Sequence, residues 1–256
     1  MGKIIIANWK ANLGSLDEAR GLFEAENKAS GEYPSVETVI CPPFVFIEEL
    51  SGMAVDTGLA VLGAQDVSQE ASGPHTGEVT VEMLKGFGVK YVLVGHSDRR
   101  SLGDTDEVIN KKIKLLIEAD ITPVLLVGEE EKNDAISQDT LVDQLSRGLE
   151  GLAKEQVKKV ILTYEPVWAI STSKDAEADT SEGAVSAIKM MQDILVKLFN
   201  FDLDDMPKIL YGGSVKETNV GDFMAKSEIA GAVVGGASLR PEEFKNILKI
   251  TNENSS

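Results

Sequence analysis

Eight short apolar runs, rich in β-branched residues, recur along the 256-residue chain. Most of them are continuous rather than alternating, which is typical of strands buried on both faces of a parallel sheet. One run, VETVIC, is mixed and would be ambiguous by itself. The runs begin at Lys3, Val36, Leu59, Lys90, Thr122, Val160, Lys208 and Gly231. They predict eight strands, most of them parallel and buried.

Amphipathic helical segments lie between several of these runs. The segment 15–28 opens with Ser15 and carries Glu18 three residues later, the pattern of a capping box. The segments 105–119 and 181–199 each carry an apolar stripe at helical spacing. The stripes are formed by Val108, Ile109, Ile113, Leu116 and Ile117, and by Val185, Ile188, Met191, Leu195 and Leu198.

Strands that alternate with helices predict repeated βα units. Eight units in 256 residues give about 32 residues per unit, the size of a βα repeat. We therefore expect an α/β fold, a (β/α)8 TIM barrel, as a single domain over residues 1–256 with a frayed tail from about residue 250. A doubly wound open sheet is the alternative, but no GxGxxG motif follows the first strand, which argues against a dinucleotide-binding version.

Charge, cysteine content and the length of the apolar stretches indicate which binding partners and which cellular compartment to expect. The net charge is −17 and no long run of Lys or Arg is present, so a nucleic-acid partner is not expected. Cys41 is the only cysteine; we expect a buried thiol rather than a nucleophile, in a reducing compartment. No signal peptide is recognised and no apolar stretch approaches the roughly 20 residues of a membrane span. These features predict a cytoplasmic protein without a membrane partner.

In a βα barrel the chemistry lies at the C-terminal ends of the strands. Glu165 follows the sixth run, where apolar neighbours would raise the pKa of its carboxyl group and make it a better base. His96 follows the fourth run and opens a helix, whose positive end disfavours protonation of the imidazole. Lys10 follows the first run, where its cation could hold a phosphate or an enolate. Each has an ordinary alternative: a solvated strand-end charge, a structural histidine or a surface lysine.

Two glycine pairs follow the last two runs, in YGGS at 211–214 and VVGGASL at 233–239. Residues without side chains let backbone N–H groups approach an anion, and the next helix start adds its dipole. The two histidines, His75 and His96, and the one cysteine are too far apart in sequence for a metal-binding motif. No GxSxG motif is present, so a serine hydrolase is poorly supported.

The motifs NWKAN, GHSDRR, YEPVWAI, YGGSV and VGGASL, in this order and spacing, resemble the triosephosphate isomerase family. The segment 63–84 resembles the third loop of that family, and the resemblance covers essentially the whole chain. It implies interconversion of dihydroxyacetone phosphate and D-glyceraldehyde 3-phosphate through an enediolate, in glycolysis and gluconeogenesis. It implies neither a cofactor nor a metal.

The resemblance also implies a role for each matching residue, in a mechanism established for this family. Glu165 would be the base, His96 the neutral electrophile, and Lys10 with Asn8 would hold the substrate and stabilise the enediolate. The phosphate would be gripped by the backbone N–H groups of Ser171, Ser214, Gly235 and Gly236. Members of the family are usually homodimers, so Thr76 would reach across an interface to support the site of the other copy.

Three positions depart from the family pattern. A lid that commonly reads Gly-Thr-Gly is Ser171-Thr172-Ser173 here, and serine disfavours positive φ angles. Asp98 stands where the family has glutamate, so we expect a longer or water-mediated contact with Lys10. Leu126 replaces a cysteine and is interpreted as a packing variant.

The altered lid is consistent with one alternative: the chain would be a catalytically weakened homologue with a phosphate-binding or interaction role. Another phosphate-handling barrel enzyme is a second alternative. It would account for the glycine pairs but not for the joint presence of NWK, GHS and YEPVW.

Overall fold

The computed structural model describes residues 2–132, 134–170 and 179–255. In these residues parallel strands close into a barrel in the order β1-β2-β3-β4-β5-β6-β7-β8, and β8 pairs with β1. All eight predicted strands are present, and the predicted α/β barrel is confirmed. The strands are β1 Ile4–Asn8, β2 Glu37–Cys41, β3 Val61–Ala64, β4 Tyr91–Val94, β5 Thr122–Val127, β6 Ile161–Tyr164, β7 Ile209–Tyr211 and β8 Gly231–Val234.

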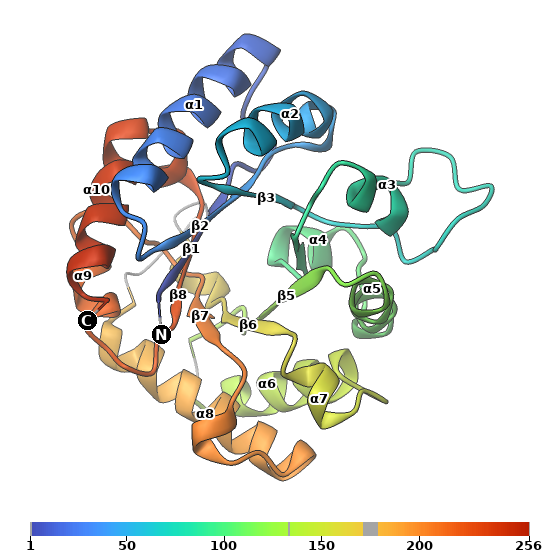
Figure 1. Cartoon of the computed structure of the whole chain (residues 1–256). Coiled ribbons are helices and arrows are strands. Elements are labelled where there is room, and N and C mark those ends of the chain that lie inside the picture. The colour runs from blue at the N-terminus through green and yellow to red at the C-terminus, as the bar shows by residue number, and fades with distance from the viewer. Residues whose placement is uncertain (1, 133, 171–178, 256) are drawn as a thin grey trace.

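Helices form a ring around the strands (Figure 1). The α-helices are α1 Leu16–Glu32, α2 Ile47–Thr57, α3 Val81–Gly86, α4 Ser97–Ser101, α5 Asp106–Glu118, α6 Asp134–Gly148, α7 Lys154–Val157, α8 Ser181–Phe199, α9 Val220–Met224 and α10 Pro241–Glu253. Short 3₁₀ helices are η1 Phe44–Phe46, η2 Val167–Ala169, η3 Leu203–Asp205 and η4 Gly236–Leu239. Among the helices described, none combines the length and the apolar composition that a membrane span requires.

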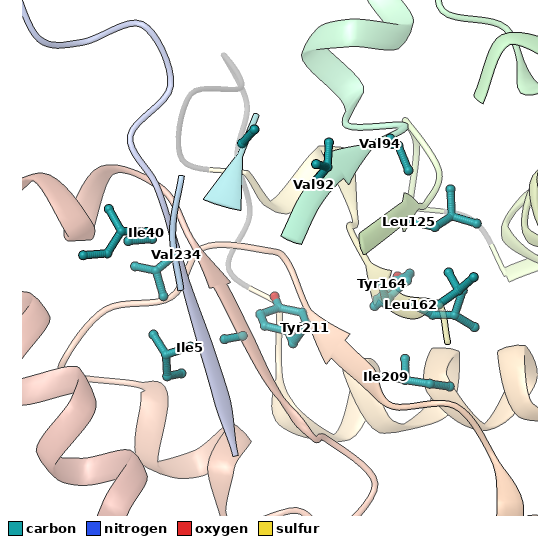
Figure 2. Packing of buried hydrophobic residues seen from close by; sticks show 14 of the residues in the cluster. Ile5, Ile40, Val92, Val94, Leu125, Leu162, Tyr164, Ile209, Tyr211 and Val234 are labelled. Atoms are coloured by element: carbon teal, nitrogen blue, oxygen red, sulfur yellow. The ribbon is translucent and has the colours of Figure 1, made fainter. Parts of the chain in front are cut away.

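The core has two layers because successive side chains of a strand point to opposite faces. On β1, Ile4 and Ile6 pack inside the barrel with side chains of other strands, whereas Ile5 and Ala7 pack outside with the helices. Figure 2 shows the outer layer, with labelled side chains from β1, β2 and β4 to β8. Burial on both faces explains why the strands have continuous apolar sequences. Cys41 is a free, buried thiol in the inner layer, as predicted.

Three local predictions need correction. The hydroxyl of Ser15 caps α1 by accepting from the Glu18 N–H, but the Glu18 carboxylate accepts from the Gly14 N–H, so the capping box is only half formed. Leu198 lies in the last turn of α8 and is 44% exposed, because that turn extends past the surface on which the helix packs. The chain stays helical to Glu253, beyond the expected start of fraying, because the buried face of α10 continues to Thr251, which is fully buried.

Candidate active site

A cavity of about 550 Å³ opens at the C-terminal ends of the strands. The structure brings together at its wall the predicted residues Asn8, Lys10, His96, Glu165, Ser214, Gly235 and Gly236. Ser171 and the rest of the lid segment Ser171-Thr172-Ser173 lie outside the described residues. Thr76 lies apart, in the exposed segment between β3 and α3 that projects away from the barrel in Figure 1.

The end of β1 delivers Asn8 and Lys10 to the cavity. Lys10 has a φ angle of 51°, in the left-handed region that lysine seldom occupies. Two side chains hold this turn: the Asn8 Oδ1 accepts from the Lys10 N–H at 3.1 Å, and the Gln65 Nε2 donates to the Lys10 carbonyl at 2.9 Å. The Gln65 amide also donates to the Cys41 carbonyl at 3.0 Å, so it ties the ends of β1 and β2 together. In the sequence Gln65 directly follows the third apolar run, and no role was predicted for it.

The Lys10 ammonium forms a direct ion pair with Asp98, with 3.0 Å between Nζ and Oδ2. The expectation of a longer or water-mediated contact is therefore wrong. The flexible four-carbon stem of lysine spans the distance that the shorter aspartate leaves. Asp98 is 57% exposed, so this pair is screened by solvent and leaves Lys10 able to bind an anion in the cavity.

His96 is the N-cap of α4 and is held as a neutral imidazole. Its Nδ1 accepts from the Asp98 N–H at 2.9 Å, so the ring proton lies on Nε2. Burial, and less strongly the positive charge of Lys10, lower the pKa of His96 to about 4, against the opposing charge of Asp98. The helix start predicted from the sequence is present, but burial is the main cause of the lowered pKa. The site thus presents an N–H donor that carries no charge.

Glu165 follows β6 and is only 3% exposed. Three donors surround its carboxyl group: the Ser97 N–H to Oε2 at 2.9 Å, the Ser97 hydroxyl to Oε1 at 3.3 Å, and the His96 Nε2 to Oε1 at 3.1 Å. Burial raises the pKa of Glu165 to about 8, against the opposing effects of the Ser97 N–H and the Lys10 charge. A carboxyl group with a pKa close to neutrality can both take up and release a proton. Ser97 was not predicted; its signal was its place directly after His96 at the start of α4.

The backbone of Glu165 is fixed from the neighbouring strand. Its N–H donates to the Val127 carbonyl at 2.8 Å, and a Cβ atom added to Gly128 would overlap the Glu165 carbonyl oxygen. Glu129 holds the segment that follows, because its Oε1 accepts from the Tyr164 hydroxyl and from the Trp168 Nε1, each at 2.8 Å. The base therefore stands on a rigid strand end.

The other side of the cavity is suited to an anion. Ser214 follows the glycine pair after β7, and Gly235 and Gly236 open the short helix η4 after β8. Lys216 and Arg240 line the same cavity and add positive charge, although the whole chain carries −17. Sequence reasoning missed both cations, whose signal was their position two and four residues after Ser214 and Gly236. Within the described residues, no group of three His, Cys, Asp or Glu side chains could hold a metal ion.

Comparison with known proteins assigns the family. The family model described as triosephosphate isomerase matches residues 3–251. A triosephosphate isomerase of Dictyoglomus turgidum is 38% identical over 250 residues, which cover 96% of this chain and 98% of the relative. Triosephosphate isomerases of Clostridium perfringens and Caldanaerobacter subterraneus are each 40% identical over 248 residues, with 96% of this chain and 98% of the relative covered. The barrel, the cavity at its strand ends and these relatives agree that the chain belongs to the triosephosphate isomerase family.

Proposed function

We propose that Glu165, His96 and Lys10 carry out the reaction of this triosephosphate isomerase, the interconversion of dihydroxyacetone phosphate and D-glyceraldehyde 3-phosphate. The observation that carries the assignment is the 3.1 Å contact between the Glu165 carboxyl group and the His96 Nε2 in one cavity. A base and a neutral donor so close together can act on adjacent atoms of a small substrate.

The reaction then proceeds by two proton transfers at carbon and one between the two substrate oxygens. Glu165 removes a proton from the carbon next to the substrate carbonyl, and the electron pair of that C–H bond forms the enediolate. The His96 Nε2–H donates a hydrogen bond to the carbonyl oxygen, and the Lys10 ammonium stabilises the negative charge that develops there. The hydroxyl proton of the substrate moves to the former carbonyl oxygen, and the proton held by Glu165 returns to the neighbouring carbon, which gives the other triose phosphate. To reach the substrate, Glu165 exchanges its contacts with Ser97 and His96 for contacts with the substrate.

Asn8 helps Lys10 to hold the substrate, and the phosphate group binds at the other side of the cavity. The backbone N–H groups of Ser214, Gly235 and Gly236 grip it, together with that of Ser171. Lys216 and Arg240 provide local positive potential, which a dianion needs in a protein of net charge −17. No step of this mechanism requires a cofactor.

We further propose that the chain works as a single domain and as a homodimer in the cytoplasm, without a nucleic-acid or membrane partner. The support for the dimer is apolar surface: Val45 is 81% exposed and Leu102 76% exposed. Contiguous exposed apolar patches are typical of protein–protein interfaces, and we propose that these two side chains belong to one. The segment with Thr76 projects from the barrel and could reach a second copy (Figure 1).

A coupled assay with D-glyceraldehyde 3-phosphate tests the catalytic assignment. Glu165→Gln keeps the shape of the side chain but removes the base, so we expect kcat to fall by about 10²- to 10⁴-fold. Glu130→Gln is the matched control, since Glu130 is an exposed carboxylate near the same barrel end, and it should keep normal turnover. Near-normal kcat in Glu165→Gln would refute the assignment. Binding of the substrate without turnover in the unmodified protein would instead favour the weakened homologue.

A further inference from the structure

A buried carboxyl group contacts the strand end that carries Lys10. Glu26 of α1 is 1% exposed, and its Oε2 accepts from the Trp9 Nε1 at 3.0 Å. The Trp9 side chain is fully buried. The second carboxyl oxygen of Glu26 is also buried and has no hydrogen-bond partner among the described residues. The bond to the indole is therefore the one polar contact found for this carboxyl group in the described structure.

An acid at this position is unfavourable for stability. The neighbours of Glu26 on the buried face of α1 include the apolar residues Ala19, Leu22 and Phe23. Burial raises the pKa of the Glu26 carboxyl group well above its ordinary value, against the opposing bond from Trp9. A leucine would bury more apolar surface here, but it would leave the indole N–H without an acceptor.

The position of Trp9 connects this bond to the cavity. Trp9 stands between Asn8 and Lys10, and Lys10 adopts the left-handed φ angle of 51°. A strained backbone conformation persists only where its surroundings hold it in place. Asn8 and Gln65 hold the turn from one side through the backbone of Lys10. Glu26 holds it from the helix side, through the indole of the preceding residue.

We propose that Glu26 is a positioning residue for the isomerisation: by anchoring the Trp9 indole, it keeps the turn at Lys10 in the conformation that aims the ammonium group into the cavity. This proposal rests on the role of Lys10 given under the proposed function. Glu26 touches neither the cavity wall nor the substrate and acts only through Trp9.

Three variants of the full-length protein test it. Glu26→Leu removes the acceptor, and a displacement of Lys10 by a fraction of an ångström should lower kcat/KM by about 10- to 100-fold. Glu26→Gln keeps a carbonyl acceptor for the indole and should stay within about threefold of the unmodified enzyme. Asn27→Leu is the matched control: Asn27 is buried next to Glu26 on the same helix but bonds to Thr57 and the Ala60 N–H, away from β1. It should keep kcat/KM even if it destabilises the fold.

The pH profile provides a readout that a merely structural role would not change. The charge of Lys10 lowers the pKa of Glu165, and His96 and Asp98, the other groups beside it, remain in place in the variant. If Lys10 moves away, the acid limb of kcat/KM should shift to higher pH in Glu26→Leu and stay unchanged in Glu26→Gln and Asn27→Leu.

The proposal is overturned if Glu26→Leu keeps kcat/KM and its pH profile, or if Asn27→Leu loses activity to the same extent. If Glu26→Leu does not fold, Trp9→Phe removes the donor of the same bond and is expected to reproduce the loss and the shift; unchanged kinetics would overturn the proposal. Lys10→Met separates the two proposals: normal kinetics in that variant would contradict the role of Lys10 itself. A collapse in Lys10→Met beside normal kinetics in Glu26→Leu would contradict only the role of Glu26.

Discussion

Replacing Glu165 by glutamine should change how the stability of the protein depends on pH. Burial raises the pKa of Glu165 from 4.5 to about 8. Between these two values the folded protein holds a proton that the unfolded chain has lost. The free energy of unfolding therefore falls as the pH rises through this window, by about 1.4 kcal/mol per pH unit. Glutamine does not titrate and lacks this contribution.

The expected size of the effect follows from the pKa. When the pH rises from 5 to 7.5, titration of Glu165 should lower the free energy of unfolding of the unmodified protein by about 3 kcal/mol. The glutamine variant should not show this decrease. The amide has its own penalty, since its NH₂ group must face either the Ser97 N–H or the His96 Nε2–H, and both are donors. That penalty is the same at both pH values, so it cancels when the change between them is compared.

Urea unfolding at a fixed protein concentration, at pH 5 and at pH 7.5, measures this difference. The free energy of unfolding of Glu165→Gln minus that of the unmodified protein should be about 3 kcal/mol larger at pH 7.5 than at pH 5. Glu130→Gln, which replaces an exposed carboxylate, should follow the unmodified protein. Parallel behaviour of Glu165→Gln and the unmodified protein would mean that burial does not raise the pKa of Glu165, and the explanation of its strength as a base would fail.

Three further outcomes are expected. Gly128→Ala should lower kcat by about 100-fold with the fold retained by circular dichroism, because the new Cβ atom would push the Glu165 carbonyl out of place; unchanged kcat would contradict this. Lys112→Met should cost about 1.5–3 kcal/mol in urea unfolding at pH 7, since it removes one of the two cations, Lys112 and Arg99, that Asp66 and Asp104 share. Leu102→Lys should weaken the proposed dimer, so light scattering should report a dimer for the unmodified protein and a larger monomer fraction for the variant; a monomeric unmodified protein would refute the dimer.

The strands and the location of the site could be predicted from the sequence for a physical reason. Strands buried on both faces leave continuous apolar runs, and parallel strands in a barrel all end at the same rim. Glu165, His96 and Lys10 therefore had to lie near one another once the eight runs were recognised. The same reasoning holds for the glycine pairs.

The contacts around these residues could not be predicted in this way. The bonds from Ser97 to Glu165 and from Trp9 to Glu26 depend on side-chain directions and on how a helix packs, which strand periodicity does not specify. The contact of Lys10 with Asp98 was misjudged because the length of one side chain was considered without the flexibility of the other. Which side chains contact a site residue depends on how the helices and strands pack in three dimensions.

Two of the buried acids near this barrel end, Glu165 and Glu26, show what distinguishes a base from an anchor. Glu165 and Glu26 are buried almost equally, and burial raises the pKa of both. Glu165 is surrounded by three donors and lies near the charge of Lys10, and each of these favours the carboxylate, so its pKa stays within reach of neutral pH. Glu26 has one donor, the indole of Trp9, among the described residues, so less opposes the effect of burial on the pKa of its carboxyl group. The two acids therefore differ in the number of donors around each carboxyl group and not in depth, and only Glu165 lines the cavity, where it can exchange a proton with the substrate.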